Sequence, residues 1–364
     1  MTKRILFLTG KRGGFGAMEP TLQAIRDHPT LELKTYVCDQ HLHHRFGTTI
    51  TEVTKFDPRY LHGACPATYH DVQGRLSYMG TILAELPLRL REYKIDILLL
   101  IGDRLESLMG AITAHNLNIP IAHVQAGDIT GGVDNAQRWA ISHMSRWCFA
   151  GNKDALTRLQ RKLTDAEIHL VGDVHIDRLM QERGKDPTAI LDRLGLSSYK
   201  IIILLQHPDT LHPEKSYEQI AETIDALKYH QEDGYQIVAI YPCSDQGHDD
   251  IISELDCQPW VVERNIPHGE FITLLEQASC LVGNSSCGII EAPYLNTPSV
   301  DIGNRQKGRG AGETAKIMAA SHNAKSIQQA ITAAMDGSWP IEKYIPQYGD
   351  GTAYQKIVEV LAND

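Results

Sequence analysis

The stretch IDILLLIGDRLES (95–107) decides the fold class. Its apolar run shows no alternation, which is typical of a strand buried on both faces of a parallel sheet. Charged residues follow the run at once, and a helix-length amphipathic segment comes next. This order of buried strand, polar turn and helix predicts one unit of a doubly wound α/β domain.

The same order recurs along almost the whole chain. In the first half the expected strands are RILFLTG (4–10), LELKTYVC (31–38), IDILLLIG (95–102), IPIAHVQA (119–126), RWCFAG (146–151) and IHLVGD (168–173). In the second half they are KIIILLQH (200–207), YQIVAIYP (235–242), PWVVE (259–263), SCLVGN (279–284), PSVDIG (298–303) and AKIMAAS (315–321).

The two sets of strands predict two Rossmann-like α/β domains, at residues 1–174 and 175–348, with a cleft between them. The polar segment ERGKDPTAILDRLGLSS (182–198) joins the two sets and is expected to be the hinge. Residues 349–364 predict a C-terminal helix after a Gly-Asp-Gly turn, and we expect it to pack back on the first domain.

The composition argues against several classes of function. The chain has 364 residues, of which 42% are hydrophobic and 22% charged, and its net charge is −10. Its basic residues form no stripe, which argues against nucleic-acid binding. No apolar run approaches the ~18 residues of a membrane span, and seven cysteines without a C-x-x-C pair are typical of a reduced chain. We therefore expect a cytoplasmic protein that binds neither nucleic acid nor a membrane.

A histidine-rich tract invites a metal-binding interpretation, which its spacing does not favour. QHLHHRFG (40–47), with His62 and His70 later in the chain, matches no standard zinc pattern, and no cysteine pair accompanies it. We expect a mobile, polar loop there and no bound metal.

Candidate functional residues follow the expected strands, because ligands of parallel sheets bind at the carboxyl ends of strands. The turn TGKRGGFGAMEP (9–20) offers Gly10 for close backbone approach to an anion and Arg12 for charge. It is neither a G-x-G-x-x-G nor a P-loop motif, although Asp39 could act as the ribose acid of a dinucleotide fold. A dehydrogenase therefore stays open at this point.

Three further strand ends carry titratable groups. Asp103 in GDRLES (102–107) can cap the next helix and can also act in a site, since the two roles do not exclude each other. The loop HVQAGDITGGVDNAQRWAI (123–141) supplies Asp128, Asp134 and Arg138, the last two spaced as an i, i+4 pair. In QHPDT (206–210), His207 stands before a proline at a strand end, which favours a functional position.

The stretch GNSSCGIIEAP (283–293) predicts a phosphate seat at a helix N-terminus, with Glu291 one to two turns inside that helix. The small residues of the seat include Asn284, Ser285, Ser286 and Gly288. Glu291 is placed to accept hydrogen bonds from a ribose diol. The loop IGNRQKGRG (302–310) adds Arg305, Lys307 and Arg309, and a basic cluster beside an anion seat indicates a diphosphate.

Together these motifs resemble the hydrolysing UDP-N-acetylglucosamine 2-epimerases and their non-hydrolysing relatives. The resemblance covers nearly the full chain, and it implies two domains of the GT-B type. The pieces GNSSCG and RQKGR are the ones most specific to the hydrolysing branch. The resemblance implies a nucleotide-sugar substrate, no cofactor and a homodimer or homotetramer.

The resemblance also assigns roles to matching residues. The residues that match nucleotide-binding positions are Arg12, Ser285, Ser286, Glu291 and Arg305, and His207 matches a histidine at the pyrophosphate. Asp103 and Asp134 match active-site acids, and Arg138 matches an arginine close to them.

This chain departs from the family pattern at several positions. Gln125 stands where many relatives carry glutamate or histidine, and a glutamine cannot exchange a proton at neutral pH. Asp128, Trp139 and Phe15 replace a glutamate, a histidine and a tyrosine. Either Gln125 only orients the substrate, or Asp128 takes over its work, or the chemistry is altered.

The family route implied is anti elimination of the nucleotide diphosphate to a 2-acetamidoglucal, followed by hydration. Asp103 and Asp134 suit proton transfer at C2, while Arg12, His207 and the amides of residues 285–288 suit the leaving diphosphate. Because nearby carboxylates repel, one of them is expected to keep its proton near pH 7.

Other activities stay open from the sequence. They are a non-hydrolysing 2-epimerase, a GT-B glycosyltransferase that needs an acceptor, and a nucleotide-sugar-binding protein whose catalysis is lost at Gln125. The sugar is GlcNAc or a 2,4-diacetamido-6-deoxyhexose, carried by UDP or GDP.

Overall fold

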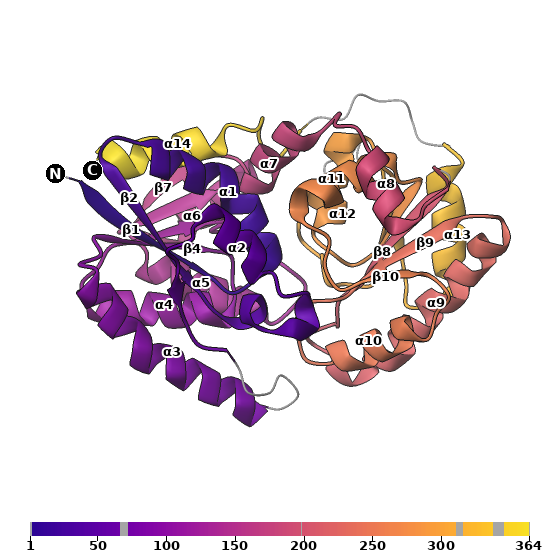
Figure 1. Cartoon of the computed structure of the whole chain (residues 1–364), viewed down its shortest axis with the longest axis horizontal. Coiled ribbons are helices and arrows are strands. Elements are labelled where there is room, and N and C mark those ends of the chain that lie inside the picture. The colour runs from indigo at the N-terminus through magenta and orange to yellow at the C-terminus, as the bar shows by residue number, and fades with distance from the viewer. Residues whose placement is uncertain (1, 66–71, 198, 311–315, 338–345, 364) are drawn as a thin grey trace. The chain divides into compact units, whose positions relative to one another are not determined.

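The computed structural model describes residues 2–65, 72–197, 199–310, 316–337 and 346–363. It divides into two compact units (Figure 1). The first contains residues 1–129, 133–180 and 348–364, and the second contains residues 130–132 and 181–347.

The first unit is built on a parallel sheet with the strand order β3-β2-β1-β4-β5-β6-β7. Its strands are β1 (Lys3–Thr9), β2 (Leu31–Val37), β3 (Leu61–His62), β4 (Ile97–Ile101), β5 (Ile121–Val124), β6 (Trp147–Ala150) and β7 (Glu167–Leu170). Its helices are α1 (Arg12–Asp27), α2 (Ile50–Phe56), α3 (Val72–Glu92), α4 (Leu105–Asn116), α5 (Asp134–Met144), α6 (Lys153–Lys162), α7 (Val174–Glu182) and α14 (Ala353–Asn363).

Helices cover both faces of this sheet, which explains why its strands are continuously apolar. One core cluster joins the central strands to Phe15 of α1 and Ile357 of α14, and another joins them to Ile82 of α3 and Met109 of α4. Figure 1 shows the yellow α14 lying along the indigo α1, although the two helices come from opposite ends of the chain.

The second unit has a parallel sheet with the strand order β10-β9-β8-β11-β12-β13. Its strands are β8 (Ile201–Leu205), β9 (Gln236–Ile240), β10 (Val261–Glu263), β11 (Cys280–Gly283), β12 (Ser299–Ile302) and β13 (Ile317–Ala320). Its helices are α8 (Thr188–Leu194), α9 (Ser216–Glu232), α10 (His248–Asp256), α11 (His268–Gln277), α12 (Cys287–Ile290) and α13 (Ala324–Met335).

The predicted fold class, two parallel α/β domains, is confirmed, and each expected run contains a strand. The strand β3 was not predicted, because a two-residue edge strand shows no periodicity. Within the segment 182–198, which was expected to be the hinge, residues 188–194 form α8. The side chains of Ile190 and Leu194 are buried in the core of the second unit, so amphipathic packing outweighs the polar composition of this segment.

The expectation of a mobile, polar loop at residues 40–47 is wrong, because this segment is structured and partly buried. It forms the 3₁₀ turns η1 (Asp39–Leu42) and η2 (His44–Phe46), and His41 is fully buried. The His41 ring contacts Thr9 Oγ1 at 3.0 Å and Thr49 Oγ1 at 2.8 Å, and burial lowers its pKa to about 3. His41 therefore serves packing, and His70 lies outside the described residues.

Candidate active site

In the first unit the predicted residues gather at the carboxyl ends of β1, β4 and β5. The chain runs from β1 to β2 and β3 on one side and returns with β4 on the other, so β1 and β4 form a topological switch point. Such points are where doubly wound sheets bind ligands. Gly10 and Arg12 follow β1, Asp103 follows β4, and Gln125 follows β5.

Arg138 joins two of these strand ends. Its guanidinium forms an ion pair with the Asp103 carboxylate and donates from Nη1 to the Gln125 carbonyl at 2.9 Å. The Arg138 side chain is 3% exposed and that of Asp103 is 18% exposed. Gln125 has a left-handed backbone with a φ of 60°, a strained conformation that clusters at functional sites. The buried guanidinium stabilises the ionised form of Asp103.

Asp103 lies just before α4, which begins at Leu105 with Arg104 as its N-cap residue. Arg104 contacts Asp39 Oδ2 at 3.2 Å and Glu106 Oε1 at 3.5 Å. The charges of the GDRLES motif are therefore paired, as burial of charge requires.

Gly10 has a steric role that the sequence did not reveal. A Cβ at residue 10 would lie 2.5 Å from Glu106 Oε1, and Glu106 is only 2% exposed. The end of β1 can approach α4 this closely only because residue 10 has no side chain.

The other predicted residues of the first unit occupy helix starts and a buried loop. Arg12 is the first residue of α1 and Asp134 is the first residue of α5, one turn before Arg138. Asp128 is buried in the loop that follows β5. A carboxylate in the first turn of α5 is stabilised by the helix dipole.

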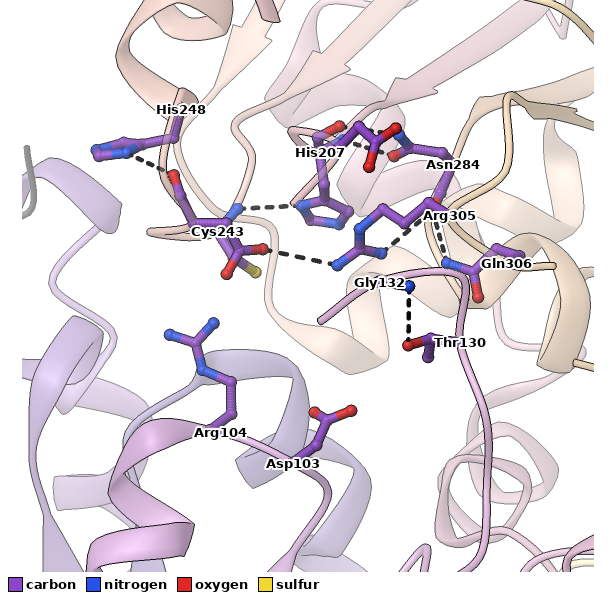
Figure 2. Close-up of polar contacts among 12 residues, drawn as sticks. Asp103, Arg104, Thr130, Gly132, His207, Cys243, His248, Asn284, Arg305 and Gln306 are labelled. Carbon is purple, nitrogen blue, oxygen red and sulfur yellow. Dashed lines mark hydrogen bonds and ion pairs between the residues drawn. The ribbon is translucent and has the colours of Figure 1, made fainter. Parts of the chain in front are cut away.

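In the second unit the switch point lies between β8 and β11, and His207 and Asn284 meet there. The backbone N–H of His207 donates to Asn284 Oδ1 at 2.7 Å, and Asn284 Nδ2 donates back to the His207 carbonyl at 2.8 Å (Figure 2). The Cys243 backbone N–H donates to His207 Nδ1 at 3.1 Å. Because Nδ1 accepts, the proton of the neutral ring lies on Nε2, which makes His207 a hydrogen-bond donor through Nε2.

The basic loop reaches the same strand end. Arg305 Nη1 donates to the Asn284 carbonyl at 3.3 Å, and Gln306 Nε2 donates to the same oxygen at 2.7 Å (Figure 2). Asp245 lies 3.6 Å from Arg305 Nη2. The backbone N–H of Gly131, in the 130–132 segment grouped with the second unit, donates to the Arg305 carbonyl at 2.9 Å.

The predicted phosphate seat is a tight turn followed by a very short helix. Within the described chain no hydrogen bond reaches the backbone N–H of Ser285 or Ser286, so both can donate to an anion. α12 spans only Cys287–Ile290, and Glu291 follows it. The expectation that Glu291 lies inside a longer helix is wrong, because Pro293 lacks the N–H that a continuing α-helix needs.

Glu291 is nevertheless buried and partnered. Its side chain is 4% exposed, and Oε1 lies 2.8 Å from Nε2 of His268, the first residue of α11. A buried carboxylate held by an imidazole is a preorganised acceptor for hydroxyl groups.

Several residues of these sites were not singled out by sequence reasoning. They are Glu106, Asp173, His175, Cys243, Asp245, His268 and Gln306. Asp173 and His175 follow β7 in VGDVHID, so the strand-end rule points to them as it did to His207. His268 comes near only through tertiary folding, and no local signal marks it, whereas Gln306 lies within the RQKGR motif.

Two further observations concern metals and membranes. Among the described residues, no group of three or more His, Cys, Asp or Glu side chains is arranged to hold a metal ion. Within the same ranges, no helix is long and apolar enough to cross a membrane.

Comparison with known proteins identifies the family. A family profile described as UDP-N-acetylglucosamine 2-epimerase matches residues 23–362. The chain belongs to the UDP-N-acetylglucosamine 2-epimerase family. This membership, which the resemblance predicted, leaves no place for the dehydrogenase alternative.

Individual members of the family span almost the whole chain. The UDP-N-acetylglucosamine 2-epimerase of Neisseria meningitidis is 30% identical, over 99% of this chain and 95% of that protein. The UDP-N,N'-diacetylbacillosamine 2-epimerase (hydrolyzing) of Legionella pneumophila is 29% identical, over 99% and 96%. The fold matches the UDP-GlcNAc 2-epimerase of Methanocaldococcus jannaschii, solved with UDP-GlcNAc and UDP, at a TM-score of 0.82 and 17% identity over 99% of this chain and 100% of that one.

Proposed function

We propose that the chain is a hydrolysing nucleotide-sugar 2-epimerase. It converts UDP-GlcNAc, or a UDP- or GDP-linked 2,4-diacetamido-6-deoxyhexose, into the free 2-epimeric sugar and the nucleotide diphosphate. The observation that carries the proposal is the set of donors at the β8/β11 switch point. His207, whose Nδ1 accepts from the Cys243 amide, is hydrogen-bonded to Asn284, and the amides of Ser285 and Ser286 follow Asn284 in the chain.

The second unit is proposed to bind the nucleotide. His207 Nε2, the two amides and Arg305 all present positive charge or donors to a diphosphate. Glu291 accepts hydrogen bonds from the ribose hydroxyls. Arg309 adds positive charge to the loop that carries Arg305. The Methanocaldococcus jannaschii relative was solved with UDP-GlcNAc and UDP, which supports a nucleotide of this type.

The first unit is proposed to carry the proton transfers. Arg138 stabilises the ionised Asp103, so this carboxylate suits the base that removes the C2 proton. Gly10 and Arg12 offer close backbone approach and positive charge for an anion at the end of β1, and Asp134 and Asp128 add acidic groups near the end of β5. Gln125 orients the sugar, because its amide exchanges no proton at neutral pH.

Release of the free sugar is supported by two observations. The chain contains GNSSCG and RQKGR, the motifs that resemble the hydrolysing branch. The Legionella relative, at 29% identity, is named as hydrolysing. The Neisseria relative carries no such word in its name at 30% identity, so retention of the nucleotide on the sugar is the second candidate.

Proton NMR of the purified protein with UDP-GlcNAc in deuterated water tests the proposal. Free ManNAc with deuterium at C2, appearing together with UDP, is the expected result. UDP-ManNAc as the product would show the non-hydrolysing reaction instead. If UDP binds but neither UDP-GlcNAc nor the UDP- and GDP-linked diacetamido sugars react, the protein only binds nucleotides and the proposal is wrong.

A further inference from the structure

Gln125 lies against an aspartate–histidine pair at the end of β7. Gln125 Nε2 donates to Asp173 Oδ2 at 2.9 Å and lies 3.2 Å from His175 Nδ1. His175 Nδ1 lies 2.8 Å from Asp173 Oδ1, which also accepts the His175 backbone N–H at 3.0 Å. The pair therefore sits beside the glutamine that occupies a proton-transfer position of the family.

The hydrogen bonds fix where the His175 ring carries its protons. The Asp173 side chain is fully buried, and burial alone would raise its pKa. The His175 charge and the hydrogen bonds from His175 and Gln125 outweigh burial and lower this pKa to about 2. An ionised carboxylate only accepts hydrogen bonds, so His175 Nδ1 carries the donated proton. Proton exchange with a substrate must then take place at His175 Nε2, and the side chain is 16% exposed.

The first unit needs such a group. Arg138 stabilises the ionised Asp103, and the α5 dipole stabilises negative charge on Asp134. Both carboxylates thus suit bases, whereas hydration of an acetamidoglucal also needs an acid that protonates C2. Gln125 cannot supply that proton. An imidazolium paired with a buried aspartate can, as aspartate–histidine pairs do in other enzymes.

We propose that His175 is the general acid of the hydration step, with Asp173 and Gln125 as its positioning residues. The proposal rests on the proposed function of the preceding subsection. It differs from a purely structural role, in which the pair would only shape the turn into α7.

The proposed chemistry balances over the two steps. In elimination, Asp103 takes the C2 proton, the C–H electron pair forms the C1–C2 double bond, and the C1–O pair leaves with the diphosphate. In hydration, the His175 Nε2–H proton bonds to C2 on the opposite face, while a water oxygen bonds to C1 and releases a proton to solvent. Asp103 then loses its proton and the His175 imidazole gains one, both through solvent.

The test is product analysis of His175→Gln with UDP-GlcNAc in deuterated water, followed by NMR. We expect ManNAc formation to fall by about 10²- to 10⁴-fold, the usual contribution of a general acid. UDP release should continue, and 2-acetamidoglucal should accumulate. Asp173→Asn, which leaves the imidazolium without its carboxylate, should show the same accumulation more weakly. His115→Gln, exposed at the end of α4, is the matched control and should behave as wild type.

Each outcome bears on the proposal. If His175→Gln forms ManNAc at a rate within threefold of wild type, the proposal is wrong. It is also wrong if His175→Gln keeps wild-type UDP affinity and thermal stability but loses UDP release and ManNAc formation to the same extent. If His175→Gln does not fold, Asp173→Asn decides by the same criteria. If the wild-type protein makes UDP-ManNAc, the proposed hydrolysis is wrong, but the role of His175 is still tested, because accumulation of the glucal in His175→Gln would still report on it. A wild-type protein that turns over no nucleotide sugar would overturn both proposals.

Discussion

Two carboxylates of the second unit, the buried Glu291 and the half-buried Asp301, differ in how they are partnered. Glu291 has an imidazole partner in His268, whereas Oδ1 of Asp301, on β12, has no hydrogen-bond partner within the described chain. Asp301 lines a small cavity together with Ser285 and Gly288. The carboxylate of Glu291, which has a partner, is positioned to bind a ligand. The carboxylate of Asp301, which lacks one at Oδ1, is expected mainly to lower the stability of the fold when it is ionised.

Glu291→Gln should weaken UDP binding. Hydrogen bonds to charged groups contribute about 1.5–3 kcal/mol, so loss of the negative charge that is proposed to accept the ribose hydroxyls should raise the Kd about 10- to 100-fold. Isothermal titration calorimetry with UDP measures this. Glu270→Gln on α11, the helix that carries His268, has a 44% exposed side chain and is the control. A Kd within twofold of wild type for Glu291→Gln would remove Glu291 from the nucleotide site.

Asp301→Asn should stabilise the protein above about pH 6. Burial raises the pKa of Asp301 from 3.8 to about 6, although the charges of Arg305 and Arg309 oppose this. Since the folded pKa exceeds the unfolded one, ionisation opposes folding. The free energy of unfolding of the wild type should therefore fall, through this group, as the pH rises from about 4 to about 6. Thermal melts of the two proteins should coincide near pH 4 and separate at pH 7.5, with Asp301→Asn melting higher; equal melting temperatures at both pH values would contradict this.

At the scale of elements, short loops after the strands bring distant side chains together. The β1–α1 turn places Gly10 in close contact with Glu106 of α4. The β5–α5 loop positions Arg138 to form its ion pair with Asp103. Each of these loops leaves the carboxyl end of a parallel strand, so their residues share one edge of the sheet. The candidate site of the first unit therefore depends on the geometry of these loops more than on the identity of any one residue.

Gly10→Ala should destabilise the first unit. The new Cβ would meet a buried carboxylate, and overpacking of this kind usually costs about 1–3 kcal/mol. Gly14→Ala is the matched control, because its Cβ would lie 3.5 Å from Ile101, an ordinary contact. Alanine is also favoured over glycine in a helix by about 1 kcal/mol, so this control should be neutral or stabilising. Urea unfolding measures both, and equal stabilities would show that Glu106 moves aside.

At the scale of the whole molecule, the C-terminal helix belongs to the first unit. Lys3 Nζ donates to the Leu361 carbonyl at 3.1 Å, and Asp177 of α7 accepts the backbone N–H groups of Ala353 and Tyr354 at 2.9 and 2.7 Å. Asp177 therefore satisfies two amides at the start of α14 that no side chain of α14 itself satisfies. The last residues of the chain thus complete the core that its first strand begins.

Leu361→Ala should destabilise the first unit without affecting UDP binding. Leu361 is fully buried in the cluster that contains β1 and α1, and truncating a buried leucine costs about 2–5 kcal/mol. Hydrogen exchange of β1 peptides should become faster, while Glu359→Ala, exposed on the same helix, should leave it unchanged. Unaltered exchange in Leu361→Ala would mean that α14 contributes little to this core.

The sequence by itself determined the two parallel sheets and most of the strand-end residues. Both follow from local patterns: an apolar run without alternation marks a buried strand, and the residue after it must lie at a ligand-binding edge. The family also followed from motifs within single loops, such as GNSSCG and RQKGR.

Only the tertiary structure decided how those residues are paired. Arg138 and Asp103 are 35 positions apart, and Gln125 and His175 are 50 apart. The His207 proton is placed on Nε2 by the backbone of Cys243, 36 positions away. These contacts depend on the order of strands in each sheet, which periodicity does not encode. The chemistry of each side chain was therefore readable from the sequence, whereas its protonation and partner were set by long-range packing.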